Sequence, residues 1–523
     1  IVHIAAGFNL LAQKTLRANF NFYYVPPLFS YLLAPIFSLI GLFGILLGKF
    51  QGIADYQNFV LLKKEYFLAV SRIISAILGT GAVYLIYLLA KKIFSSQKIS
   101  LIAALFLTFD FFSVHESQLG RFWMPLTFFF LAAAYFIYRL YKEGDLKWYL
   151  LAGLMIGFGF GAGYAAIMMS LWFLISHLSR KKEGFWSKKL FAGAGLILGL
   201  TFLFSYLNPT AFIRQFGHMI FTIGSFFGQN ISFTEIDAPS QVQSAAYYFK
   251  LMIGFLWHNS PLFFIFGLLG FLIIGFSKKE RLLKFLLIGV PVVYLFIITF
   301  LFSGIEGRYV LPAVPFFILA ASYFIVEVSG RFKTSKLQKG LLAILVLTIG
   351  SYSFYISSAY ALKLRRPDTR IQALNWIYKN FEPSSSIIMG EEYLELNETK
   401  ESILFLKENN PSRVDTKRNH LLTLDEKEYP QPYYLVYHLG RLDSTKLDFQ
   451  EIKPNYLIFS FWTKEIQNTI NDYPYQKELI KKFYPKKEVS DLGNLLNEPA
   501  GRPFWTLNNI DYFGPYVEIY KLQ

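Results

Sequence analysis

Long apolar runs separated by short polar segments fill the first two thirds of the chain. One run is GLLAILVLTIGSYSFYISSAY, from Gly340 to Tyr360, and two others are LLKFLLIGVPVVYLFIITFLF and YVLPAVPFFILAASYFIV. A helix needs about 20 apolar residues to cross a hydrocarbon core of about 30 Å. Because these runs are apolar on every face, their backbone and side chains suit a bilayer rather than a soluble core. The pattern therefore predicts a polytopic α-helical membrane protein.

Ten runs are predicted to cross the membrane, near residues 67–90, 99–114, 124–140, 148–162, 165–178, 190–207, 261–276, 285–302, 309–328 and 340–359. The two crossings within 148–178 are short and meet at the glycines between Gly157 and Gly163. Segment 28–48 is also apolar, but a crossing there would invert every later loop. We therefore expect it to be an outer-surface or re-entrant helix. The chain starts within a loop-like segment, so a first helix and the start of the first outer loop are expected before Ile1. The total is then about ten or eleven membrane helices.

After residue 360 the pattern changes and the long apolar runs stop. DTRIQALNWIYKNF places apolar residues on one helical face, and TKEIQNTINDYPYQKELIKKFY is also predicted as helix. The short apolar segments SSSIIMGEEY, PNYLIFSFW and YVEIYKL are predicted strands. This alternation predicts a transmembrane domain over residues 1–359 and a small soluble α/β domain over residues 360–523.

The distribution of charge orients these domains. The net charge is +16, and residues 1–359 hold 29 Lys and Arg against 12 Asp and Glu, whereas residues 360–523 hold 22 against 23. Nineteen of those basic residues lie in alternate loops, at 91–98, 139–147, 180–189, 278–284 and 331–339, and only four lie in the loops facing the other way. The positive-inside rule places the basic loops in the cytoplasm. We expect a multi-pass plasma-membrane protein with an extracytoplasmic C-terminal domain, whose basic surplus is a topology signal rather than a nucleic-acid surface.

Several kinds of chemistry are excluded or unsupported by the residues present. The chain has no cysteine, so disulfides, thiol catalysis and cysteine metal sites are excluded. There is also no P-loop, no dinucleotide fingerprint and no HExxH spacing. No cofactor is expected, although a divalent cation is compatible with the sequence.

The first group of candidate residues lies in DFFSVHESQLGRFWMPLTFFF, at one predicted outer end of the helices. It contains Asp110, His115, Glu116, Arg121 and Trp123. A carboxylate beside an imidazole could act as a base, and an arginine could bind a phosphate. The alternative is an interfacial helix cap with a tryptophan at the head groups.

A second group lies in SGIEGRYVLPAVPF, where Glu306 and Arg308 precede Tyr309 in a short outer loop. The guanidinium could bind a phosphate or pyrophosphate through two hydrogen bonds, or it could simply pair with the glutamate. Tyr24, in NFNFYYVPPLFSYL, could line a groove. Trp257 and His258, in an amphipathic part of loop 208–260, are candidates for substrate contact or for a structural role.

Three runs together resemble a known family. They are NFNFYYVPPLFSYLLAPIF, then RIISAILGTGAVYLIYLLAKKIFSSQKISLIAALFLTFDFFSVHESQLGRFWMPLTFFFLAAAYFIYRL, then EGRYVLPAVPFFILAA. Their order and placement are similar to the GT-C membrane glycosyltransferases of family 39, which include protein mannosyltransferase-like and aminoarabinose transferase-like enzymes. The resemblance covers roughly residues 1–330, and the tail resembles the outer soluble domain of bacterial members. It implies inverting transfer of a sugar, hexosyl or pentosyl, from a polyprenyl-phosphate donor to a protein, lipid or glycan acceptor on the outer face.

The resemblance also implies roles for particular residues. The main catalytic Asp of the family is expected before Ile1. A second family acid, in R-x-D-x-P-L, is replaced here by Trp123, which leaves Glu116 or Asp110 as catalytic substitutes. Arg308 matches the outer-loop Arg-Tyr that contacts the donor phosphate, with Tyr309, Arg121 and Tyr24 as further phosphate contacts. The substrate cavity is then expected to contain His115, Glu306, Trp123, Trp257 and His258.

Two other functions fit a polytopic chain. A transporter or flippase for lipid-linked glycans would place ionisable residues on helix faces in the middle of the membrane. A polysaccharide ligase would share the GT-C architecture, and only its substrates would distinguish it.

Overall fold

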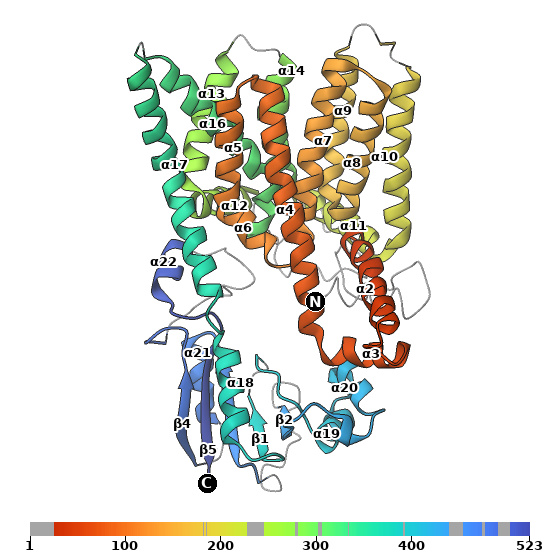
Figure 1. Ribbon diagram of the computed structural model, residues 1–523, viewed down its shortest axis with the longest axis vertical. Helices are drawn as coiled ribbons and strands as arrows, with labels where there is room; N and C mark the ends of the chain where they lie inside the picture. The colour runs from red at the N-terminus through yellow and green to blue at the C-terminus, as the bar shows by residue number, and fades with distance from the viewer. Residues whose placement is uncertain are drawn as a thin grey trace. The chain divides into compact units, whose positions relative to one another are not determined.

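The fold is described from a computed structural model, shown in Figure 1. The structure describes residues 26–180, 183–184, 186–226, 245–277, 281–301, 306–332, 334–390, 393–438, 453–472, 476–489 and 503–523. The chain forms two compact units. The membrane unit contains residues 1–50 and 65–357, and the sheet unit contains residues 51–64 and 358–523.

The membrane unit is built from helices alone among its described residues, which confirms the predicted polytopic helical fold. The helices are α2 (Leu28–Leu46), α4 (Lys64–Phe94), α5 (Gln97–Phe109), α6 (Phe111–Ser117), α7 (Trp123–Glu143), α8 (Leu146–Ala162), α9 (Met169–Leu178), α10 (Lys188–Leu207), α11 (Pro209–Phe226), α12 (Ala245–Asn259), α13 (Pro261–Phe276), α14 (Arg281–Lys284), α15 (Val290–Leu301), α16 (Val314–Gly330) and α17 (Ser335–Leu364). Three short turns join some of them: η1 (Tyr164–Met168), η2 (Phe285–Gly289) and η3 (Gly307–Ala313).

All ten predicted crossings fall on helices, but their lengths differ. In the described part of the chain, six helices are long and apolar enough to span a bilayer, and two bent pairs bring the number to eight. The bent pairs are α5 with α6, at 56°, and α12 with α13, at 112°. The predicted crossings at 148–162, 165–178 and 285–302 correspond to shorter apolar helices. Segment 28–48 forms α2, which is long enough to cross, and its predicted surface or re-entrant placement stays a prediction.

Burial separates central helices from those that face outward. In α7 and in the η3–α16 segment, 83% of the apolar window is buried, whereas the fractions are 28% for α10 and 22% for the segment that contains α17. Exposed apolar side chains on a helix of this length need lipid around them. Close packing at the centre depends on small residues, since a Cβ added to Gly270 of α13 would collide with the carbonyl of Ala320 in α16.

The sheet unit has a five-stranded mixed sheet in the order β2-β1-β3-β5-β4. Its strands are β1 (Ser386–Met389), β2 (Leu435–His438), β3 (Tyr456–Phe461), β4 (Lys477–Phe483) and β5 (Tyr516–Leu522). Strand β1 pairs in parallel with β2 and β3, and β5 pairs antiparallel with β3 and β4. Helix α18 (Thr369–Asn380) packs Ala373 and Ile377 against the sheet, whereas Ile371, predicted on the same apolar face as Ile377, is half exposed. The remaining helices are α3 (Ile53–Leu62), α19 (Lys400–Asn409), α20 (Thr416–Leu421), α21 (Lys464–Asn468) and α22 (Pro503–Asn509).

The predicted small α/β domain is confirmed, with one error inside it. The single helix predicted for TKEIQNTINDYPYQKELIKKFY is wrong, because only Lys464–Asn468 is α-helical and Lys477–Phe483 is strand β4. The lysines of this segment suit the exposed edge of a sheet, where charge discourages pairing with other chains. Strand β2 was not predicted, whereas β1, β3 and β5 coincide with the three predicted strands.

Helix α3 belongs to the sheet unit although it precedes α4 in the chain. The Nε2 atom of His420 in α20 lies 2.6 Å from Oδ1 of Asn58, and Lys64 forms an ion pair with Glu395.

Candidate active site

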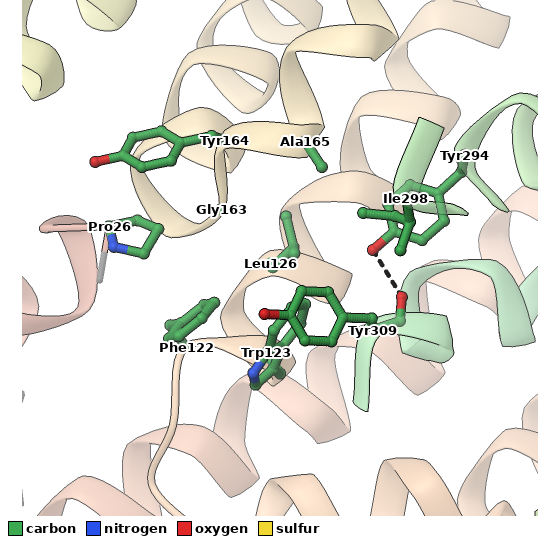
Figure 2. Close-up of a pocket in the computed structure, with 10 residues that line it drawn as sticks. All are labelled: Pro26, Phe122, Trp123, Leu126, Gly163, Tyr164, Ala165, Tyr294, Ile298 and Tyr309. Atoms are coloured by element: carbon green, nitrogen blue, oxygen red, sulfur yellow. Dashed lines mark hydrogen bonds between the residues drawn. The ribbon is translucent and has the colours of Figure 1, made fainter. Parts of the chain in front are cut away.

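A cavity of about 60 Å³ lies within the membrane unit, where several helix ends meet (Figure 2). It is lined by Pro26, Phe122, Trp123, Leu126, Gly163, Tyr164, Ala165, Tyr294, Ile298 and Tyr309. These residues come from the start of α7, the junction of α8 with η1, α15 and η3. Two short loops predicted to face the same side, at 115–123 and 163–164, thus contribute to one cavity, together with Tyr309 of η3.

Aromatic rings form the wall between α7 and η3. The rings of Trp123 and Tyr309 have centroids 4.6 Å apart and planes at 60°, in an edge-to-face contact. The hydroxyl of Tyr294 donates a hydrogen bond of 2.9 Å to the carbonyl of Tyr309, drawn as a dashed line in Figure 2. Because Tyr294 is itself fully buried in α15, this bond fixes the position of η3 against the bundle.

The wall on the other side depends on the break between α8 and η1. Gly163 occupies this break, and a Cβ there would lie 2.6 Å from the Cδ2 atom of Leu126. Glycine therefore allows the chain to approach α7 closely, and Tyr164 follows directly on the cavity wall. The predicted helix break at the glycine run thus forms part of the cavity wall.

Arg308 lies one residue before Tyr309, and its guanidinium forms an ion pair with Glu306. Glu306 stands at the start of η3, and its carbonyl accepts a 3.0 Å hydrogen bond from the Tyr309 N–H. Both charged side chains are partly buried. Arg308, predicted to bind the donor phosphate, and Glu306, predicted in the substrate cavity, are therefore next to the aromatic wall, although neither side chain lines the cavity.

Asp110 is fully buried and already engaged by three donors. Its Oδ2 accepts from the N–H and the hydroxyl of Ser113, each at 2.9 Å, and its Oδ1 accepts from the hydroxyl of Ser260 at 2.7 Å. Asp110 is the N-cap of α6, and Ser260 lies at the bend between α12 and α13. This carboxyl therefore joins two bent helix pairs, an arrangement that favours a structural role.

Glu116 is also fully buried, but its surroundings differ. Its Oε1 lies 3.4 Å from Nδ1 of His115, which is longer than a normal hydrogen bond. Within the described residues, neither oxygen of the Glu116 carboxyl has a hydrogen-bond partner. Neither Glu116 nor His115 lines the cavity. A buried carboxyl without a donor is costly, so it calls for a functional explanation.

The remaining predicted residues lie in different places. Arg121 is partly buried two residues before Trp123. Trp257 is about half exposed near the end of α12, and the backbone carbonyl of His258 accepts a 2.7 Å hydrogen bond from the Tyr352 hydroxyl. Neither Trp257 nor His258 lines the cavity, and Tyr24 lies outside the described residues. Among the described residues no cluster of three His, Asp or Glu side chains is arranged for a metal ion.

The structure also adds residues that the sequence did not single out: Pro26, Phe122, Tyr164 and Tyr294. Two of these residues lie beside features visible in the sequence: Tyr164 follows the glycine run that predicts a helix break, and Pro26 is one of two consecutive prolines. No such feature marks Tyr294, because it lies inside an unbroken apolar run.

Comparison with known proteins bears on this site. Residues 61–208 match the family described as dolichyl-phosphate-mannose-protein mannosyltransferase. Among solved structures, ArnT from Cupriavidus metallidurans in the apo state shares 12% identity, with 92% of this chain and 90% of that chain covered and a TM-score of 0.46. The same protein bound to undecaprenyl phosphate shares 11% identity, covering 92% and 91%, with a TM-score of 0.49. No curated protein matches the chain.

The segment matched by the family runs from the end of α3 to the end of α10, and it contains Asp110, Glu116, Arg121 and Trp123. It supports a glycosyltransferase of the GT-C type in a multi-pass membrane protein. The resemblance predicted from the sequence, to the mannosyltransferase family of GT-C glycosyltransferases, is thereby confirmed.

Proposed function

We propose that this protein is an inverting glycosyltransferase that moves a hexosyl or pentosyl group from a polyprenyl-phosphate donor to a protein, lipid or glycan acceptor at the extracytoplasmic face. The observation that carries the proposal is the aromatic cavity between Trp123 and Tyr309, with Arg308 directly beside it. The family match over residues 61–208 supports the general reaction class. The identity of the donor and of the acceptor, and the membrane face where the reaction takes place, are proposed in addition to this reaction class.

The chemistry of the cavity suits a sugar. Aromatic rings present flat apolar faces to the C–H groups of a sugar, and tyrosine hydroxyls offer hydrogen bonds to its oxygens. A volume of about 60 Å³ holds several water molecules, which a bound sugar would displace.

Arg308 is the proposed contact for the donor phosphate. A guanidinium binds phosphate oxygens through two parallel hydrogen bonds, and the carboxylate of Glu306 presents a similar pair of oxygens to it now. In the proposed cycle, phosphate replaces the Glu306 carboxylate. The cation then stabilises the negative charge that develops on the phosphate as the bond to the sugar breaks.

Glu116 is the proposed base among the described residues, in preference to Asp110. Inverting transfer is a single displacement and needs one carboxylate to accept the proton of the acceptor. The Asp110 carboxyl already accepts three hydrogen bonds, whereas the oxygens of Glu116 accept none from the described residues. Glu116 does not line the cavity, so its approach to the acceptor requires a shift of α6, which packs against η3.

Purified protein in lipid nanodiscs, given radiolabelled polyprenyl-phosphate sugars and peptide, lipid or glycan acceptors, tests the proposal. We expect transfer with inversion at the anomeric carbon, read by NMR of the product. Arg308→Ala should lower kcat/KM for the donor by about tenfold to a hundredfold, the loss of a charge-assisted hydrogen bond, and Arg308→Lys should restore part of it.

The control is Arg331→Ala, which removes an exposed arginine after α16 and should leave kcat/KM unchanged. Absence of transfer with every donor and acceptor would overturn the proposal. Movement of a lipid-linked sugar across vesicle membranes without transfer would instead support a flippase.

A further inference from the structure

The last membrane helix, α17, leaves the apolar layer at a position that its sequence defines. Its apolar run ends at Tyr360, and the first charged residue after it is Lys363, followed by Arg365 and Arg366. A helix rises 1.5 Å per residue, so the boundary of the hydrocarbon core falls within the last two turns of α17. Residues 358–364, the last two turns of α17, belong to the sheet unit.

One face of these two turns holds the segment that directly follows α22. The rings of Tyr360 and Phe513 have centroids 5.5 Å apart. The Nζ atom of Lys363 donates a hydrogen bond of 2.5 Å to the carbonyl of Ile510, and Nη1 of Arg366 donates one of 3.3 Å to the carbonyl of Asp511. Tyr360 and Lys363, about one turn apart in α17, and Arg366, just beyond its end, thus hold segment 510–513 against the end of the helix.

This attachment places α22 beside the last turns of α17 (Figure 1). Pro503 and Leu507 of α22 are buried in the sheet unit, but the Trp505 side chain is 61% exposed. A single exposed apolar residue on a soluble surface needs no explanation. Here the exposed indole occurs within five residues of a segment bonded to a membrane helix, and Leu362 in that helix is also exposed.

We propose that α22 lies in the head-group layer of the bilayer, where Trp505 anchors the sheet unit to lipid. An indole ring prefers this layer because it combines an apolar body with one N–H donor. Lys363, Arg365 and Arg366 stand at the level of the lipid phosphates and attract them, while exposed Asn509 faces water from the same short helix. The occupant of this surface is therefore lipid rather than a protein partner. The proposal is independent of the reaction that the membrane unit catalyses.

Residues 1–523 contain no cysteine, so a single introduced cysteine is the only labelling site among them. Trp505→Cys is labelled with an environment-sensitive fluorophore, and the full-length protein is reconstituted into vesicles of phosphatidylcholine and phosphatidylglycerol. Quenching by head-group nitroxide lipids and by aqueous iodide is then compared. The matched control is Glu478→Cys, an exposed position on edge strand β4.

We expect the label at position 505 to emit at shorter wavelength and to be quenched severalfold more by nitroxide lipid than by iodide, with the opposite order at position 478. Asn509→Cys, on the same helix, gives a second reading if Trp505→Cys does not fold, and it should be quenched by nitroxide lipid more than position 478. Equal iodide quenching at positions 505 and 478, or nitroxide quenching at position 509 no greater than at position 478, would overturn the proposal.

Discussion

The indole ring of Trp123, the first residue of α7, contacts the phenol ring of Tyr309, in η3, edge to face at 4.6 Å between centroids. The contact closes one side of the cavity, and the Tyr294 hydroxyl holds the backbone of Tyr309 in place. Two segments far apart in the chain thus form a single wall. Several testable consequences depend on this wall and on the packing around it.

Removing the indole should disable the cavity. Trp123→Ala is expected to lower sugar transfer by tenfold or more, because the ring supplies contact area to the substrate and an aromatic pair worth about 0.5–1.5 kcal/mol. Trp123→Phe should retain more activity, since a ring remains. The measurement is kcat/KM for the donor, with the melting temperature followed to show that the protein is folded.

Trp186→Ala provides the matched control for that substitution. Trp186 is strongly exposed, stacks on Phe191 and does not line the cavity. Equal losses of activity in the Trp123 and Trp186 variants would show that the cavity is not the sugar site.

Substitutions of the two buried carboxyls, Glu116 and Asp110, should have different effects on activity and on stability. Glu116→Gln is expected to abolish most transfer with little loss of stability, because no hydrogen bond from the described residues is removed. Asp110→Asn should instead lower the melting temperature, because an amide cannot accept all three of the bonds from Ser113 and Ser260. A stable, inactive Asp110→Asn beside a fully active Glu116→Gln would reverse the assignment.

Helix packing at the centre of the membrane unit should be sensitive to one methyl group. Gly270→Ala is expected to destabilise the protein by about 1–3 kcal/mol, because the new Cβ meets the Ala320 carbonyl and α13 must move away from α16. Thermal unfolding in detergent measures the effect. Gly275→Ala, on the same helix, should be neutral or slightly stabilising, because the nearest atom to its Cβ would be 4.0 Å away. Similar melting temperatures for both variants would contradict this.

The sheet unit should lose stability in acid through one buried carboxyl. Burial by itself raises the pKa of Glu398, but hydrogen bonds from His438 and Arg418 outweigh it and bring the pKa to about 2. Since the pKa is lower in the folded than in the unfolded state, the stabilisation is complete above the ordinary value of 4.5 and is lost as pH falls from there towards 2. The difference corresponds to about 3 kcal/mol.

Hydrogen exchange in β2 and α20 measures this loss locally. Between pH 5 and pH 3 the stability of these elements, corrected for the intrinsic effect of pH on exchange, should fall in the native protein. Glu398→Gln should start less stable and show a smaller fall, because its amide does not titrate. A native protein whose corrected stability is constant over that range would contradict the prediction.

Much of the architecture could be predicted from local pattern. The apolar runs located the helices, and the loss of those runs after residue 360 located the sheet unit. Strands β1, β3 and β5 were predicted because short apolar segments of that length suit a buried strand. Strand β4 was missed, because KELIKKF is an edge strand whose charged residues resemble a helix surface when read alone.

The candidate site was predicted only in part, and the residues show why. Trp123 and Tyr309 were selected because they stand at helix starts beside charged loops, where sequence carries a signal. Tyr294 carries none, since in an apolar run its role comes from a hydrogen bond to a distant backbone carbonyl. The different states of Asp110 and Glu116 also depend on Ser260, which lies in another part of the chain.

The sequence by itself determined which segments are membrane helices, which loops are basic, and that a small sheet follows the membrane helices, because hydropathy and charge act locally along the chain. Only the tertiary structure decided which loops share a cavity, that α3 joins the sheet unit, and that segment 510–513 is bonded to the last turns of α17. These contacts join residues far apart in sequence. They result from packing of side chains and hydrogen bonds between elements, which no local pattern of apolar and polar residues encodes.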